Sequence, residues 1–163
     1  MNKTNYKKVI EKLHEYPSSI KIINRINFTV TTLVYCLYPI ILGRLVLTQD
    51  IRFWRLFLAP AISFILLSVI RNYINAPRPY EMFDIIPIIK KDTKGKSFPS
   101  RHVFSVFVIA MTIYYISRPI GIALMFAGVL LAIIRVVGGV HFPKDVLAGA
   151  AIGILCGILG FYL

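Results

Sequence analysis

The chain has 163 residues, of which 57% are hydrophobic and 16% charged, and its formal net charge is +12. Its mean hydropathy is +0.72. This composition excludes an ordinary soluble domain, in which about a quarter of the residues are charged. The excess of positive charge suits anionic lipid headgroups, and nucleic acid is not expected as a partner because no soluble basic face or stacking platform is present.

The first 25 residues form a basic segment in which apolar residues recur between the charges. Its cations are Lys3, Lys7, Lys8, Lys12, Lys21 and Arg25. We expect an amphipathic helix at the membrane interface that ends near Pro17. A cleavable signal peptide is not expected, because no small-residue cleavage site follows an apolar stretch of suitable length.

Five long runs without charge follow this segment. They cover residues 26–43, 56–70, 103–117, 119–134 and 146–163. Their lengths are close to, or slightly below, the roughly 20 residues that cross a hydrocarbon core. We therefore predict an all-α polytopic membrane bundle of about five transmembrane helices over residues 26–163, in the cell membrane.

Polar connections at 71–101 and 135–145 follow the second and fourth runs. Irregular backbone is not tolerated in lipid, so both must lie at an interface or line a cavity walled by protein. Because two spans separate them, they emerge on the same side. We expect their polar residues to meet at one site.

The last run contains Gly149, Gly153 and Gly157, which recur every four residues. Such a stripe lets a second helix approach closely. Packing within the bundle is the favoured interpretation, and a homo-oligomer formed through this stripe is the alternative.

The first two clusters of polar residues lie in the connection at 71–101. Arg71 ends the second run, and Arg78 is held between two prolines that stiffen the backbone. Ser100 is a natural N-cap, and the free amides at a helix start, together with Arg101, make an anion site. His102 begins a membrane helix, where an ionisable group is costly unless it is used. Taken singly, the arginines could equally contact headgroups and the serine could be an ordinary cap.

The third cluster surrounds the connection at 135–145. Arg135 closes the fourth run, and Gly138 and Gly139 permit a sharp turn before His141. Asp145 lies four residues beyond His141, so it can accept a hydrogen bond from one imidazole nitrogen and leave the other free to attack. Cations, two imidazoles, a hydroxyl and a carboxylate suit phosphoryl transfer.

Together the three clusters form a pattern: Arg71-x6-Arg78-Pro79, then Pro99-Ser100-x-His102, then Arg135-x5-His141-x3-Asp145. This pattern resembles the three-part signature of the type 2 phosphatidic acid phosphatase (PAP2) superfamily, and the spans resemble those of its small five-span bacterial members. The resemblance covers about half of the chain.

The resemblance implies a role for each matching residue. His141 would be the nucleophile that forms a phosphohistidine, Asp145 would orient it, and His102 would be the general acid. Phosphate would be bound by Arg71, Arg78, Ser100 and Arg135, with the backbone amides near Ser100 and Arg101. The chemistry would need no metal or other cofactor, and no carboxylate cluster suited to magnesium is present.

Two positions depart from the family pattern. Arg71 stands where lysine is common, which exchanges a point charge for a bidentate fork. Arg101 stands where glycine is common, so it would bind the phosphate more tightly or contact the second phosphate of a diphosphate.

The expected function is that of a membrane lipid phosphatase whose substrate enters laterally between helices. An isoprenyl diphosphate, such as the undecaprenyl carrier, and a glycerolipid phosphate, such as phosphatidic acid or phosphatidylglycerophosphate, both remain open. One alternative is a non-catalytic protein that binds or transports lipid phosphates, against which the complete catalytic set counts. Another is a vanadate-dependent haloperoxidase, but those relatives are soluble.

The side of the membrane is predicted differently by two arguments. The face with the N-terminus and both polar connections carries 15 Lys and Arg residues against 4 on the other face. The positive-inside rule therefore predicts a cytoplasmic site. Resemblance to five-span relatives that recycle the undecaprenyl carrier predicts the outer face instead.

Overall fold

The computed structural model describes residues 3–91 and 93–162. Within these ranges the chain is helical and contains no strand, which confirms the all-α prediction. The helices are α1 (Lys3–His14), α2 (Pro17–Leu47), α3 (Phe53–Ile74), α4 (Pro79–Phe83), α5 (Arg101–Ile116), α6 (Arg118–Val137) and α7 (Pro143–Tyr162). Residues 1 and 2 of the expected N-terminal segment and residue 163 of the last expected span lie outside the described residues.

Four segments, each made of one helix or of α3 together with α4, are long and apolar enough to cross a membrane. They are Pro17–Leu47, Phe53–Phe83, Arg118–Val137 and Pro143–Tyr162. The third expected run corresponds to α5, which has 16 residues and is therefore about 24 Å long, less than a hydrocarbon core. Because α5 lies inside the bundle, the neighbouring helices contact the lipid, and α5 itself need not span the full hydrocarbon core. The predicted number of five spans is therefore approximate.

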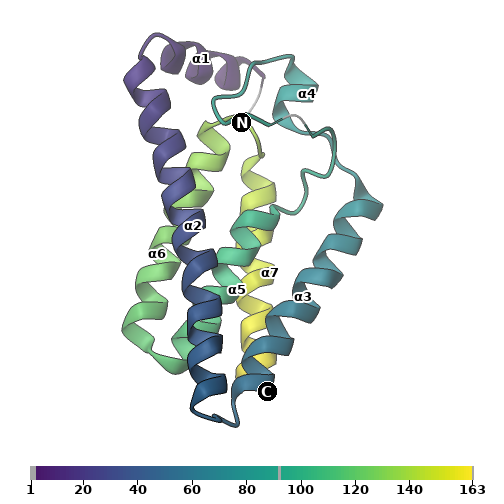
Figure 1. The fold of residues 1–163 in the computed structure, drawn as a ribbon. Coiled ribbons are helices and arrows are strands. Elements are labelled where there is room, and N and C mark those ends of the chain that lie inside the picture. The colour runs from purple at the N-terminus through teal and green to yellow at the C-terminus, as the bar shows by residue number, and fades with distance from the viewer. Residues whose placement is uncertain (1–2, 92, 163) are drawn as a thin grey trace.

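The N-terminal basic segment forms the separate helix α1, which ends at His14. Pro17 then begins α2. A proline is tolerated in the first helical turn because the N–H groups there have no acceptor within the helix. This confirms the predicted end of the amphipathic helix, while the first long helix begins at Pro17 and not at residue 26. In Figure 1, α1 lies across the end of the bundle, at a large angle to α2. The division into a segment 1–25 and a catalytic domain 26–163 stays a prediction.

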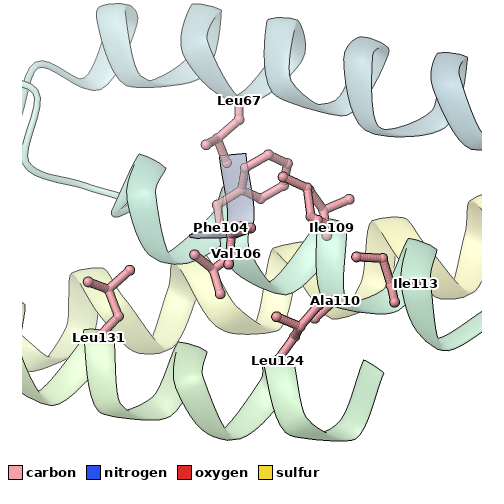
Figure 2. Close-up of a cluster of buried hydrophobic side chains, with 10 residues drawn as sticks. Leu67, Phe104, Val106, Ile109, Ala110, Ile113, Leu124 and Leu131 are labelled. Atoms are coloured by element: carbon pink, nitrogen blue, oxygen red, sulfur yellow. The ribbon is translucent and has the colours of Figure 1, made fainter. Parts of the chain in front are cut away.

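Helix α5 forms the centre of the bundle (Figure 1). Phe104, Val106 and Ala110 of α5 are fully buried, and Leu67 of α3 and Leu131 of α6 pack against the same cluster. Figure 2 shows these side chains converging from three helices. Burial of this apolar surface stabilises the bundle around the helix that begins at Ser100.

The glycine stripe of α7 faces α5 in the same chain. A Cβ atom at Gly149 would lie 2.6 Å from the Ser100 carbonyl oxygen, and one at Gly157 would lie 2.3 Å from Cβ of Met111. Only a hydrogen atom fits at these positions. The stripe therefore serves packing within the bundle, as predicted, and it fixes α7 against the start of α5.

The two polar connections lie at one end of the bundle, beside α1 and α4 (Figure 1). The turn between α2 and α3 and the turn between α5 and α6 lie at the opposite end. The predicted convergence of the three clusters on one side of the bundle is therefore confirmed.

Candidate active site

The structure brings all eight predicted site residues together at this end. A cavity of about 270 Å³ is lined by five of them: Arg71, Arg78, Arg101, His102 and His141. Arg135 contacts His102, Asp145 contacts His141, and Ser100 contacts the main chain of Asp145. The clusters thus form one connected site.

Arg71 and Arg78 are buried, with 7% and 3% of their surface exposed. Arg71, in the last turn of α3, donates to the carbonyl oxygens of Pro99 and Lys96. Arg78 donates from Nε to the Gly95 carbonyl over 3.0 Å and from Nη1 to the Val140 carbonyl over 3.0 Å. These bonds hold both guanidinium groups within the protein, so neither side chain reaches out to headgroups.

Gly95 gives the connection the shape that these arginines need. Its φ is +66°, in the left-handed region, and a Cβ atom there would lie 2.3 Å from Oδ1 of Asn75. Its N–H donates to Oε1 of Glu81 over 2.7 Å, while Oε2 of Glu81 accepts from the N–H of Arg78 over 3.4 Å. Glu81, which belongs to none of the three sequence clusters, therefore ties the two parts of the connection together.

Arg135 links the start of α5 to α2. Its Nη2 lies 2.9 Å from Nδ1 of His102, and its Nη1 donates to Oδ1 of Asn27 over 3.1 Å. A guanidinium can only donate, so Nδ1 of His102 accepts and the ring proton lies on Nε2. Asn27 was also missed, although a polar amide within an apolar run was a signal for it.

His141 is buried, with 1% of its surface exposed, and follows a turn in which Gly139 has a φ of +76°. Its Nδ1 lies 3.6 Å from Oδ2 of Asp145, beyond ordinary hydrogen-bond length. The hydroxyl of Ser97 lies between them, 3.4 Å from Nδ1 and 2.6 Å from Oδ2. The direct bond predicted from the sequence is therefore replaced by a relay through Ser97, in which Nδ1–H donates to the hydroxyl and the hydroxyl donates to the carboxylate.

The other ring nitrogen of His141, Nε2, faces Nη1 of Arg78 at 3.4 Å. Burial lowers the pKa of His141; the contact with Asp145 raises it, and the charges of Arg135 and Arg78 lower it further. A low pKa keeps the ring neutral near pH 7. The Nε2 lone pair is then available at the place where the guanidinium groups can hold an anion.

Tyr6 of α1 supports the main chain of His141. Its hydroxyl donates to the His141 carbonyl over 2.9 Å, and its ring packs on Phe83 and Phe142. Burial raises the pKa of Tyr6, so the hydroxyl stays protonated and remains a donor. The N-terminal helix is thus part of the support of the site, which its amphipathic pattern did not reveal.

Ser100 is the N-cap residue of α5, as predicted, but its hydroxyl makes no capping bond. The hydroxyl is buried and has no hydrogen-bond partner among the described residues. The Ser100 amide donates to the Asp145 carbonyl over 2.8 Å. The main chain therefore uses the Ser100 amide, while phosphate binding by the backbone amides near Ser100 and Arg101 stays a prediction. The Ser100 hydroxyl keeps its hydrogen-bonding capacity unused among the described residues.

Arg101 differs from the other arginines because it is exposed, with its guanidinium 5.6 Å from the centre of the Phe64 ring. It lines the polar cavity and also an apolar cavity of about 540 Å³ between α2, α3 and α5. Tyr38, Phe57 and Pro60 are among the walls of this apolar groove. Arg101 and His102 line both spaces, so the polar cavity and the groove adjoin at these two residues.

Positive charge exceeds negative charge in the polar cavity. Lys91 lines it together with the arginines. The arrangement suits a bound polyanion, because buried cations are costly without one. Across residues 3–91 and 93–162, no group of three or more His, Cys, Asp or Glu side chains is placed to hold a metal ion.

Comparison with protein families finds a match to the model described as "PAP2 superfamily" over residues 52–163. Bacitracin transport permease protein BcrC of Bacillus licheniformis is 27% identical over 134 residues, which cover 78% of this chain and 66% of that protein. Undecaprenyl-diphosphatase BcrC of Bacillus subtilis is 32% identical over 85 residues, covering 52% of this chain and 44% of that protein. The matched part is thus less than two thirds of either relative.

Two solved structures share the fold over nearly the whole chain. The crystal structure of Aquifex aeolicus LpxE has a TM-score of 0.75 and 25% identity, and covers 98% of this chain and 94% of that one. A transmembrane PAP2 type phosphatidylglycerolphosphate phosphatase from Bacillus subtilis has a TM-score of 0.74 and 24% identity, with coverages of 97% and 81%. For the second, the similarity is one of fold.

Proposed function

The chain belongs to the PAP2 superfamily, and from this premise we propose that it is a cell-membrane phosphatase that hydrolyses a lipid phosphate or diphosphate through a phosphohistidine at His141. The observation that carries this proposal is a cationic cavity that His141 lines, with Nε2 facing Arg78, and that adjoins an apolar groove. The guanidinium groups supply the charge that other phosphatases take from metal ions, so we propose a reaction without a metal cofactor.

In the first step, Nε2 of His141 attacks phosphorus while Arg71, Arg78, Arg135 and the free Ser100 hydroxyl hold the phosphate oxygens. The bond from phosphorus to the leaving oxygen breaks, and its electron pair stays on that oxygen. The relay through Ser97 to Asp145 stabilises the positive charge that develops on the ring. In the second step, water attacks the phosphohistidine, phosphate leaves and His141 is restored.

His102 is proposed to give a proton to the leaving oxygen and to take one from the attacking water. In this structure its Nδ1 accepts from Arg135. A second ring proton therefore requires that Arg135 turn towards the bound phosphate. The negative charge of the substrate favours both changes, since it attracts the guanidinium and raises the proton affinity of the ring.

An isoprenyl diphosphate is the substrate that we propose in preference to a glycerolipid phosphate. Arg101 stands where the polar cavity meets the apolar groove. That is the position of a phosphate lying between a terminal phosphate and a lipid tail. One relative is named an undecaprenyl-diphosphatase, which agrees with this choice.

The test is phosphate release from a lipid diphosphate by the purified protein in the presence of a chelator, with and without vanadate. We expect metal-independent release that vanadate inhibits, because vanadate mimics five-coordinate phosphorus. His141→Ala should abolish release and any trapped phosphoenzyme, whereas His14→Ala, on the exposed face of α1, should be active. Binding of the lipid without hydrolysis would favour the alternative of a non-catalytic binder.

Labelling in intact cells distinguishes the two predictions of sidedness. Lys94 is exposed and lines the polar cavity. Reaction of a Lys94→Cys variant with an impermeant maleimide would place the site on the outer face, and reaction only after permeabilisation would place it in the cytoplasm.

A further inference from the structure

Lys91 is a cation of the site that none of the three sequence clusters contains. It is half-buried and lines the polar cavity, whereas its neighbour Lys90 is exposed. The segment before it is fixed: the N–H groups of Ile88 and Ile89 both lie within hydrogen-bond distance of the Gly138 carbonyl, at 3.1 and 3.4 Å. The main chain therefore directs Lys91 to the cavity.

The surroundings of Lys91 are electrostatically unfavourable for an ammonium group. Burial, followed by the charges of Arg135, Arg78, Arg101 and Arg71, lowers the pKa of Lys91 to about 8. Three of these arginines already suffice to surround the oxygens of one phosphate. A further cation beside these four arginines is stabilised when the ligand carries more negative charge than one phosphate supplies.

Lys91 lines the same cavity as His102, the proposed acid that serves the leaving group. Arg135, which contacts His102, is also close enough to act electrostatically on Lys91. Nε2 of His141 faces Arg78 in the same cavity.

We propose that Lys91 is a catalytic residue for diphosphate substrates, in which it binds the leaving phosphate. This inference rests on the proposed phosphatase function. When His141 attacks the terminal phosphorus, the bond to the bridging oxygen breaks and the electron pair stays on the lipid monophosphate. That product gains negative charge, which a cation stabilises directly. A lipid monophosphate instead releases an alkoxide, which needs a proton from His102, so Lys91 is dispensable for it.

The experiment compares Lys91→Gln with Lys90→Gln in the purified full chain, on farnesyl diphosphate and farnesyl monophosphate. The two substrates share one tail, so their difference reports the second phosphate. We expect Lys91→Gln to lower kcat/KM on the order of tenfold more for the diphosphate than for the monophosphate. Lys90→Gln should leave both unchanged, and Lys91→Arg should recover much of the diphosphate activity.

The pH profile provides a second readout. The charged and titratable residues around Lys91 are Arg71 from α3, Arg78, Lys94 and Lys96 from the connection, Arg101 and His102 from α5, Arg135 from α6 and His141. The arginines stay charged near pH 8 and the lowered pKa of His141 keeps that ring neutral. The diphosphate kcat/KM of the wild type should therefore fall as pH rises through about 8, since the ammonium is present below that value and lost above it. This limb should be absent in Lys91→Gln.

An equal loss for both substrates, or no loss, would overturn the inference, because a structural or headgroup role does not distinguish them. A wild type that hydrolyses the monophosphate but not the diphosphate would overturn it and leave the phosphatase function intact. Hydrolysis of neither substrate, nor of phosphatidic acid, would reject the proposed function itself.

Discussion

The pair α5 and α7 and the helix α3 are packed very differently. Eleven of the 16 residues of α5 are buried, and the glycines of α7 bring the two helices into close contact. In α3, only Leu56, Pro60, Leu67 and Arg71 of its 22 residues are buried. In Figure 1, α3 leans away from the bundle towards the site end.

This difference separates two tasks. The tightly packed pair carries Ser100, His102 and Asp145, whose positions must be fixed for chemistry. Helix α3 contributes Arg71 at its last turn and otherwise forms one wall of the apolar groove. We infer that precise positioning resides in α5 and α7, whereas lipid access resides along α3.

Removal of the general acid should have the largest effect among changes in the tight pair. His102→Ala should lower kcat on an alkyl phosphate by roughly 10²–10⁴-fold. On an aryl phosphate the loss should be much smaller, because that leaving group needs little protonation. Steady-state rates on the two substrates measure this, and an equal loss on both would contradict the acid role.

Overpacking of the same pair should reduce stability. In Gly157→Val the new side chain meets Met111, since a Cβ atom already lies 2.3 Å from Cβ of that residue. We expect a loss of about 1–3 kcal/mol in the free energy of unfolding. The control is Gly43→Val in α2, where no atom lies within 4 Å of a Cβ atom. Similar unfolding transitions in detergent for the two variants would refute the packing difference.

Loss of the hydrogen-bond relay through Ser97 should lower kcat and leave KM nearly unchanged. Ser97→Ala removes the hydroxyl between His141 and Asp145, and we expect kcat to fall about tenfold, the equivalent of one hydrogen bond of about 1–1.5 kcal/mol. KM should change little. Ser63→Ala is the control, because that hydroxyl bonds only to Ala59 of its own helix among the described residues. A change confined to KM would argue against the relay.

A change in α3 should have the smallest effect on chemistry. Ala61 lines the apolar groove, whereas Ile62 is exposed. Ala61→Phe should raise KM several-fold for a long-chain lipid phosphate and leave hydrolysis of a water-soluble aryl phosphate unchanged. Ile62→Phe, one residue away, should alter neither. If Ala61→Phe slowed hydrolysis of both substrates equally, α3 would help to position the catalytic residues. The proposed difference between α3 and the pair α5 and α7 would then be wrong.

The sequence by itself determined the membrane class, the approximate spans and the residues that meet at the site. The membrane class and the spans follow from the sequence because the free energy of transfer of an apolar run into lipid depends only on the residues of that run. The alternation of spans then required both polar connections to share one side. The close approach of α7 was also foreseeable, since three glycines four residues apart offer a smooth face to a neighbouring helix.

The tertiary structure alone decided which partners these residues take. Ser97 and Asp145 are 48 positions apart, so no local pattern indicated that a hydroxyl would replace the direct contact of His141 with the carboxylate. The hydrogen bond from the Ser100 amide to the Asp145 carbonyl likewise joins residues that are distant in the sequence. Lys91 resembled any other loop lysine until the anchored segment before it placed it in the cavity. Hydrogen bonds and charge contacts depend on the packing of distant segments, and the number of competing partners is too large for spacing along the chain to select one.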